Sequence, residues 1–209
     1  MPAPATSPTD GHLIEVFSSI QGEGLMVGCR QIFVRLAGCN LDCAYCDTPF
    51  APTSDCLVEE TPGSGTFRAL PNPVSLPTLL TLLEDWLRRT PGVHHSLSLT
   101  GGEPLLHGKL LGNWLPELAR LLPLHLETNG TLPEALAPLL PHLAFISMDL
   151  KLASVTGVTT PWGIHRRFLE VARNKPGQAK AVVGPDTAGE EIEAAARLLR
   201  ETAPEWPLI

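Results

Sequence analysis

Short apolar runs alternate with helical patterns along most of this 209-residue chain, and this alternation restricts the fold more than any other feature. The runs that predict strands span 31–38, 94–104, 124–130, 144–152 and 179–184, and another begins at 206. The helical patterns span 76–87, about 109–122, 133–140, 162–174 and 189–202. Strands that alternate with helices predict an α/β fold with parallel strands and outer crossover helices, either as an open sheet or as an incomplete barrel.

Local signals define several individual segments. Ser75 precedes a series of leucines spaced for one helical face and is expected to cap that helix, and the alanine-rich stretch 189–202 is the clearest helix in the sequence. Residues 49–73 are rich in Pro, Gly, Ser and Thr, which predicts a loop insertion. We expect residues 1–12 to be a flexible lead-in and residues 13–209 to form a single core domain.

Polar and glycine-rich residues occur where the predicted strands end. These endings read AGCNLDCAYCDT from Ala37, TGGEP from Thr100, ETNG from Glu127 and SMDLK from Ser147. In α/β folds the chemistry gathers at the carboxyl ends of the parallel strands. The agreement among these four endings therefore predicts an active site at that edge of the sheet.

The composition limits the classes of partner. With 15 Lys and Arg against 22 Asp and Glu, the formal net charge is −7, which argues against a general nucleic-acid surface. No apolar run reaches the length of a membrane span and the N-terminus has no signal pattern, so we expect a cytoplasmic protein without direct membrane or nucleic-acid binding. An odd cysteine count argues against a disulfide framework, and Cys29 and Cys56 are expected to be inert thiols.

Three cysteines form a compact group with the spacing C-x3-C-x2-C, namely Cys39, Cys43 and Cys46. Cysteine thiolates are the usual ligands of iron–sulfur clusters, and three of them on a 4Fe–4S cluster leave one iron open to another ligand. The alternative is a zinc ion, which needs four ligands and would take the fourth from elsewhere, such as His107 or Cys56. The spacing alone favours the cluster and leaves the zinc site open.

The cysteine spacing, with Tyr45 before the last cysteine, and the TGGEP segment at 100–104 together resemble the radical S-adenosylmethionine superfamily. This resemblance implies an incomplete βα barrel in which the three cysteines hold a 4Fe–4S cluster. It also implies that S-adenosylmethionine chelates the open iron and that a reducing electron donor, such as flavodoxin or ferredoxin, supplies the electron that cleaves it. The resulting radical would abstract a hydrogen atom from the substrate.

A second block makes the resemblance more specific. The sequence SIQGEG at 19–24 and the pattern R-x-x-G-C-N-L-x-C-x-x-C-D-T at 35–48 resemble the 7-carboxy-7-deazaguanine synthases, and the likeness extends from about Glu15 to Val183. It implies a radical ring contraction of 6-carboxy-5,6,7,8-tetrahydropterin to 7-carboxy-7-deazaguanine with loss of ammonia, in queuosine and deazapurine biosynthesis. It also implies Mg²⁺ and a homodimer. Members of the family continue beyond the position of Ile209, so we expect a short or truncated C-terminus.

The substrate-binding residues implied by this resemblance come from the two blocks and from the TGGEP segment. They are Ile20, Gln21, Gly22, Glu23, Arg35 and Thr100. A guanidinium can hold the substrate carboxylate through charge-assisted hydrogen bonds. The amide and carboxylate of the SIQGEG block suit the donor and acceptor edge of a pterin, while its glycines allow a close approach of the backbone.

The residues implied around S-adenosylmethionine lie in the cysteine loop and at the later strand ends. They are Tyr45, Asp47, Gly101, Gly102, Glu103, Thr128, Asn129, Ser147, Asp149 and Lys151. The five from Thr128 onward could equally be loop turns and caps. The resemblance places Mg²⁺ on Thr48, and a hydroxyl together with a carboxylate and water oxygens suits this hard cation.

Two other functions remain open at this stage. A glycyl-radical enzyme activase would share the cluster and S-adenosylmethionine but would act on a protein. A zinc-binding interaction module would use the cysteines without catalysis. The SIQGEG block and Arg35 favour the small pterin substrate over both.

Overall fold

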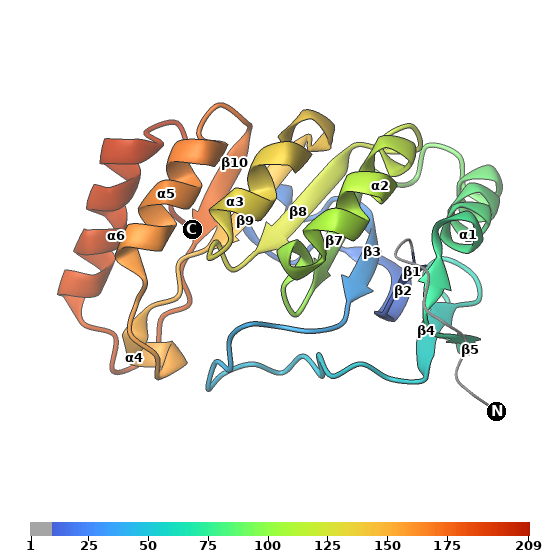
Figure 1. Ribbon diagram of the computed structural model, residues 1–209, viewed down its shortest axis with the longest axis horizontal. Coiled ribbons are helices and arrows are strands. Elements are labelled where there is room, and N and C mark those ends of the chain that lie inside the picture. The colour runs from blue at the N-terminus through green and yellow to red at the C-terminus, as the bar shows by residue number, and fades with distance from the viewer. Residues whose placement is uncertain (1–9) are drawn as a thin grey trace.

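A single sheet of eight strands forms the centre of the computed structural model, which describes residues 10–209 and leaves residues 1–9 outside the description. Its strand order is β10-β9-β8-β7-β3-β2-β4-β5. The two outermost strands in this order are not neighbours, so the sheet is open and forms the incomplete barrel expected from the sequence. Figure 1 shows the arrangement of the elements.

The strands of this sheet are β2 (Leu13–Ile20), β3 (Arg30–Leu36), β4 (Asp55–Glu59), β5 (Phe67–Pro71), β7 (Ser96–Gly101), β8 (Leu124–Thr128), β9 (Phe145–Asp149) and β10 (Gly177–Lys180). A separate pair consists of β1 (Asp10–Gly11) and β6 (Val74–Ser75). The α-helices are α1 (Leu76–Arg89), α2 (Gly108–Leu118), α3 (Pro133–Leu136), α4 (Ala153–Thr156), α5 (Trp162–Ala172) and α6 (Gly189–Thr202). Short 3-10 helices are η1 (Gly24–Met26), η2 (Pro104–His107) and η3 (Ala137–His142).

Five consecutive strands, β3, β7, β8, β9 and β10, run parallel as the alternation predicted. Their side chains divide by the two-residue period of a strand. One face is apolar and packs against α1, α2, α3, α5 and α6, which lie on that side of the sheet (Figure 1). The residues of this face are Ile32, Val34, Leu36, Leu97, Leu99, Leu124, Leu126, Ile146, Met148 and Ala179.

The opposite face of the same five strands is mostly polar. It carries Gln31, Phe33, Arg35, Ser96, Ser98, Thr100, His125, Glu127, Phe145, Ser147, Asp149, Gln178 and Lys180. Parallel sheets are usually covered by apolar packing on both faces. A buried polar face is stable only when its groups are hydrogen-bonded, so this face must be satisfied by an internal network or by ligands.

The predictions were wrong in two places near the N-terminus. Residues 49–73 contain the antiparallel hairpin β4–β5, which sequence analysis missed because the side chains of β5 are nearly all exposed and show no apolar alternation. β2 precedes the first predicted strand and pairs with β3 in antiparallel orientation. Of the expected lead-in, Asp10–Gly11 form β1, which pairs with β6, and residues 1–9 lie outside the described residues.

The helix boundaries follow the local signals closely. Ser75 caps α1 as predicted, because its hydroxyl accepts a hydrogen bond from the Thr78 backbone N–H at 3.3 Å. The helix predicted at 133–140 instead divides into α3 and η3, where Pro138 cannot donate the backbone hydrogen bond of a continuing α-helix. In the described part of the chain, no helix is both long enough and apolar enough to cross a membrane.

Where the sequence predicted the start of a further strand, the last residues form an isolated parallel bridge with β10, between Leu208 and Ala179. The backbone N–H of Ile209 donates to Ala179 O at 2.8 Å, and Ala181 N–H donates to Ile209 O at 3.0 Å. Trp206 packs so closely on Gly177 that an added Cβ there would lie 2.3 Å from the indole ring. This contact fixes the C-terminal segment along the outer edge of β10.

Two buried histidines should make the stability of the fold depend on pH. His125 and His165 are 2% and 0% exposed, and burial lowers the pKa of each to about 4. The unfolded chain binds these protons near pH 6.5, so the stabilisation is complete above that pH and is lost as the pH falls toward 4. At pH 5 the loss amounts to about 2 kcal/mol for each histidine.

The variant His165→Phe keeps an aromatic ring but cannot titrate. We expect its free energy of unfolding to fall by about 2 kcal/mol less than that of the wild type between about pH 7.5 and pH 5. Anaerobic urea unfolding followed by tryptophan fluorescence measures both values. The same pH dependence in both proteins would show that His165 is not held neutral.

Candidate active site

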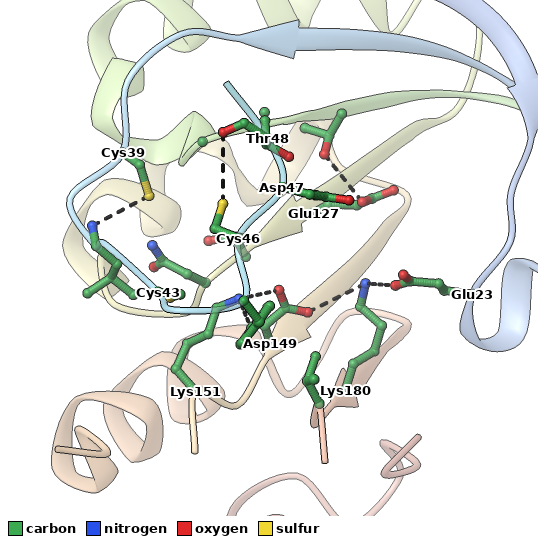
Figure 2. Close-up of a pocket in the computed structure, with 18 of the residues that line it drawn as sticks. Glu23, Cys39, Cys43, Cys46, Asp47, Thr48, Glu127, Asp149, Lys151 and Lys180 are labelled. Carbon is green, nitrogen blue, oxygen red and sulfur yellow. Dashed lines mark hydrogen bonds and ion pairs between the residues drawn. The ribbon is translucent and has the colours of Figure 1, made fainter. Parts of the chain in front are cut away.

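A pocket of about 690 Å³ opens where the five parallel strands end. Figure 2 shows the cysteine loop on one side of it and the side chains of β9 and β10 on the other. Most of the residues predicted from the sequence line this pocket: Gln21, Gly22, Glu23, Arg35, Cys39, Cys43, Tyr45, Cys46, Asp47, Thr48, Thr100, Gly101, Gly102, Thr128, Asn129, Asp149 and Lys151. The structure thus brings together motifs that are more than 100 residues apart in the chain.

Three predicted residues do not line the pocket. Ile20 is 52% exposed at the end of β2 and lies outside it. Glu103 and Ser147 are almost completely buried: Glu103 accepts a hydrogen bond from Thr128, which lines the pocket, whereas Ser147 hydrogen-bonds to His125, which does not. Direct contact of these three residues with a ligand stays a prediction.

The glycine pair of the TGGEP segment is required by the close approach of the cysteine loop. Gly101 has φ +131°, and an added Cβ would lie 2.1 Å from Leu36 O. At Gly102 an added Cβ would lie 2.0 Å from Gly38 O and 2.9 Å from the Cβ of Cys39. Only glycine fits these positions, so the pair sets the distance between the cysteine loop and the end of β7.

Glu103 ties the same region to the end of β8. Its carboxylate accepts hydrogen bonds from the Leu105 N–H at 3.0 Å, the Thr128 hydroxyl at 2.8 Å and the Asn129 N–H at 2.7 Å. Burial raises the pKa of Glu103 to about 7, although these three donors oppose the shift. Asn129 in turn donates to the side-chain oxygen of Asn40 at 2.9 Å, which links the β8 end to the cysteine loop.

The three cysteines fit an iron–sulfur cluster. Cys39, Cys43 and Cys46 are free thiols that line one pocket from a single loop. Burial raises the pKa of Cys39 and Cys43, and the nearby thiols raise it further. Three ionised thiolates are therefore stable at this site only when a cationic metal lies beside them.

The same cysteines do not resemble a zinc site. Among residues 10–209, no three His, Cys, Asp or Glu side chains converge on the position of one metal ion, as a closed tetrahedral zinc site would require. A 4Fe–4S cluster binds its thiolates on separate irons and spreads them over a larger body. The donor set therefore suits the cluster better than a single ion.

A chain of ion pairs crosses the pocket from the cysteine loop to the SIQGEG block (Figure 2). Lys151 Nζ donates to the Tyr45 hydroxyl and to Asp149 Oδ2, both at 2.8 Å. Lys180 Nζ lies 3.4 Å from Asp149 Oδ1 and donates to Glu23 Oε2 at 2.6 Å. Burial alone would raise the pKa of Asp149, but the two lysines hold it below its usual value, so all three groups are charged at neutral pH.

Glu127 is a second residue of the polar face that holds several side chains together by hydrogen bonds. Its Oε1 accepts hydrogen bonds from Gln21 Nε2 at 2.8 Å and from the Ser98 hydroxyl at 2.9 Å. Its Oε2 accepts from the Thr100 hydroxyl at 3.3 Å. This carboxylate lines the pocket and joins the SIQGEG block to β7 and β8.

Arg35 lies at the other side of the pocket, on β3. Its Nε donates to Glu15 Oε1 at 2.7 Å, and the guanidinium lies 5.8 Å from the ring centre of Phe17. Phe17 stacks on Phe33 with ring centres 5.0 Å apart. A carboxylate and an aromatic ring thus hold the arginine from one side. These contacts fix the direction in which its planar guanidinium points.

Sequence analysis missed several residues that line the pocket, among them Phe33, Glu127 and Lys180. Each of them lies on the same face of the sheet as a predicted residue. On β3 that residue is Arg35, and for the other two it is the residue paired with them on the neighbouring strand. Extending the two-residue period back from the polar strand ends would have found them.

The positions of the cysteines lead to a prediction about cluster content. Cys39→Ala, Cys43→Ala and Cys46→Ala should each abolish binding of the 4Fe–4S cluster, because each removes a ligand at the pocket. Cys29→Ala should retain it, because Cys29 does not line the pocket. Iron and sulfide analysis after anaerobic reconstitution measures the content, and equal loss in all four variants would refute this ligand set.

Comparisons with known proteins agree with the geometry. The Radical SAM superfamily pattern matches residues 34–199. A 7-carboxy-7-deazaguanine synthase from Geobacter sulfurreducens is 47% identical over 204 residues, which cover 97% of this chain and 82% of that protein. A protein of the same name from Methanothermobacter thermautotrophicus is 37% identical over 210 residues, covering 92% and 77%.

The crystal structure of QueE from Escherichia coli shows a more distant similarity, with a TM-score of 0.48 and 20% sequence identity, covering 95% of this chain and 92% of that one. The assignment rests on the sequence relatives, which are similar over most of their own length. The superfamily pattern also spans most of the chain and includes the cysteine loop and the glycine pair. The chain therefore belongs to the 7-carboxy-7-deazaguanine synthase family of the radical S-adenosylmethionine superfamily.

Proposed function

We propose that this protein converts 6-carboxy-5,6,7,8-tetrahydropterin to 7-carboxy-7-deazaguanine, with loss of ammonia, in queuosine and deazapurine biosynthesis. One observation carries the proposal: the cysteine loop, the glycine pair and the SIQGEG block of a member of this family line one pocket. Gln21, Glu23 and Arg35, by which the sequence resembles this family, thus lie beside the cysteines and glycines by which it resembles the superfamily.

The superfamily uses a 4Fe–4S cluster and S-adenosylmethionine, and the residues present fit both. When bound, they supply a radical that abstracts a hydrogen atom from the substrate. Cys39, Cys43 and Cys46 would hold the cluster. The backbone of Gly101 and Gly102 would meet the methionine part of S-adenosylmethionine, because both residues line the pocket beside the cysteine loop.

The chain of ion pairs that crosses the pocket would orient the rest of S-adenosylmethionine. Asp149 offers carboxylate oxygens to hydroxyl or amino donors, and Lys151 offers a cation to a carboxylate. Tyr45 presents an aromatic ring 5.3 Å from Lys151 Nζ. Because these side chains already hold one another in place, little conformational entropy is lost when the cofactor binds.

The pterin would lie between Arg35 and the SIQGEG block. Arg35 would bind the substrate carboxylate while Glu15 holds its Nε. Gln21 and Glu23 would meet the donor and acceptor edge of the ring, and Thr100 would contact the substrate from β7. These side chains orient the substrate so that its reacting carbon faces the cluster side of the pocket.

We also propose that Mg²⁺ takes part in the site through Thr48. This residue lines the pocket two positions after the last cysteine. A hydroxyl oxygen, the substrate carboxylate and water molecules form the kind of oxygen shell that Mg²⁺ prefers. The cation would help to neutralise the substrate carboxylate opposite the acidic residues of the pocket.

We also propose an electron donor, an oligomeric state and a cellular location for the protein. Reduction by a small one-electron carrier, such as flavodoxin or ferredoxin, is supported by the exposure of Cys46, since a cluster bound there would lie near the surface. A homodimer is supported by the open edge at β4 and β5, where Leu57 and Phe67 are 48% and 40% exposed. A cytoplasmic location suits free thiols that bind iron.

Anaerobic turnover tests the proposed function directly. The reconstituted, reduced protein is incubated with S-adenosylmethionine, Mg²⁺ and carboxytetrahydropterin, and 7-carboxy-7-deazaguanine and ammonia are measured by mass spectrometry and an enzymatic assay. We expect 7-carboxy-7-deazaguanine and ammonia to form in equal amounts, and we expect the rate of their formation to fall when Mg²⁺ is chelated. S-adenosylmethionine cleavage without product would favour an activase, and zinc without iron or sulfide would favour a binding module.

The substitution Arg35→Lys tests how the substrate carboxylate is held. A lysine has one point charge and cannot both pair with Glu15 and present a planar fork. We expect the affinity for carboxytetrahydropterin to fall about 10- to 100-fold, which corresponds to the loss of one hydrogen bond between charged groups. Calorimetric titration of both ligands measures it, and an equal loss of S-adenosylmethionine affinity would contradict this role.

A further inference from the structure

The segment Gln21–Leu25 crosses the polar face of the sheet and is fixed to β10. The Leu25 backbone N–H donates to Gln178 Oε1 at 2.7 Å, and the Glu23 carboxylate accepts from Lys180 at 2.6 Å. These contacts join residues that are separated by more than 150 positions in the sequence. The segment that carries the proposed pterin contacts is therefore held by a strand that sequence analysis did not connect with it.

Gln178 is well suited to hold this segment without touching a ligand. It is 1% exposed and does not line the pocket. While its Oε1 accepts from Leu25, its Nε2 donates to the Ser147 hydroxyl at 2.9 Å. That hydroxyl lies 2.8 Å from His125 Nε2. Both ends of the amide are thus engaged, so the side chain cannot turn away from the segment.

Gly24 lies directly against the Gln178 amide. Its φ is +64°, and an added Cβ would lie 2.1 Å from Gln178 Nε2. A larger residue would therefore be strained and would collide with a side chain that is fixed by its own hydrogen bonds. The glycine allows the backbone to pass close enough for the Leu25 hydrogen bond.

The other end of the segment is tied into the same network. Gln21 Nε2 lies 3.3 Å from Gln31 Oε1, and Gln31 Nε2 lies 3.1 Å from His125 Nδ1. His125 then leads to Ser147 and Gln178. Hydrogen bonds through β3, β8, β9 and β10 thus connect the two ends of the segment.

We propose that Gln178 is a positioning residue for substrate binding: it holds the Gln21–Leu25 segment over the sheet so that Gln21 and Glu23 are arranged for the pterin before it binds. This inference rests on the proposed function for the identity of the ligand. Because Gln178 acts through the segment and the cofactor-binding residues lie on other loops, its loss affects the pterin and spares S-adenosylmethionine.

Two variants disturb the contact from opposite sides. Gln178→Met keeps the length of the side chain and removes both hydrogen bonds, whereas Gly24→Ala pushes the backbone away from an intact Gln178. Thr202→Val serves as a matched control, because it removes another buried side-chain hydrogen bond, to Leu198 O on α6. The cluster-loaded protein is used throughout.

Hydrogen–deuterium exchange and ligand titration measure the outcome. In both variants, we expect the amides of residues 22–26 to exchange about tenfold faster. The dissociation constant for carboxytetrahydropterin should rise about tenfold, while that for S-adenosylmethionine changes less than about twofold. The control should show neither effect.

Other outcomes overturn the proposal. Unchanged exchange in this segment, or equal weakening of both ligands, would show that Gln178 has only a general structural role. If the wild type fails to bind carboxytetrahydropterin although Gln178→Met still loosens the segment, the proposed function is rejected and with it the ligand assigned here. The exchange data thus separate the two failures.

Discussion

The division of five parallel strands into an apolar face and a polar face is the constraint on which the rest of the structure depends. The apolar face packs against every long helix and supplies the core (Figure 1). Among residues 10–209, the polar face therefore stays free of long helices, with only the short η1 against β10, and can carry charged groups over a pocket. Its buried side chains are satisfied by one another, as in the contacts from Gln31 through His125 to Ser147. A site prepared in this way needs little rearrangement to bind a polar ligand.

Much of the fold could be predicted because its signals are local and periodic. The strands and most helices follow from apolar spacing, and Ser75 and the alanine-rich segment at 189–202 mark boundaries that the structure reproduces. The hairpin β4–β5 could not be predicted in the same way, since its outer strand buries almost nothing. β2 was missed because its antiparallel pairing with β3 falls outside the alternation of strands and helices.

The candidate site was predictable where its residues form short motifs. Cysteine spacing and glycine pairs can be recognised without knowledge of the fold, and these residues do line one pocket. Their partners Glu127 and Lys180 were missed because they belong to the strands themselves, where only the two-residue period points to them. Spacing also does not show which motif residues are buried, as Glu103 illustrates: it supports Thr128 and Asn129 from behind the pocket.

The most direct test of the account is electron paramagnetic resonance of the anaerobically reduced protein, recorded with and without S-adenosylmethionine. Three thiolates at one pocket leave one iron of a 4Fe–4S cluster without a protein ligand. The account predicts the signal of a reduced 4Fe–4S cluster whose g values change when S-adenosylmethionine is added. Absence of such a signal, or a signal that S-adenosylmethionine leaves unchanged, would contradict it.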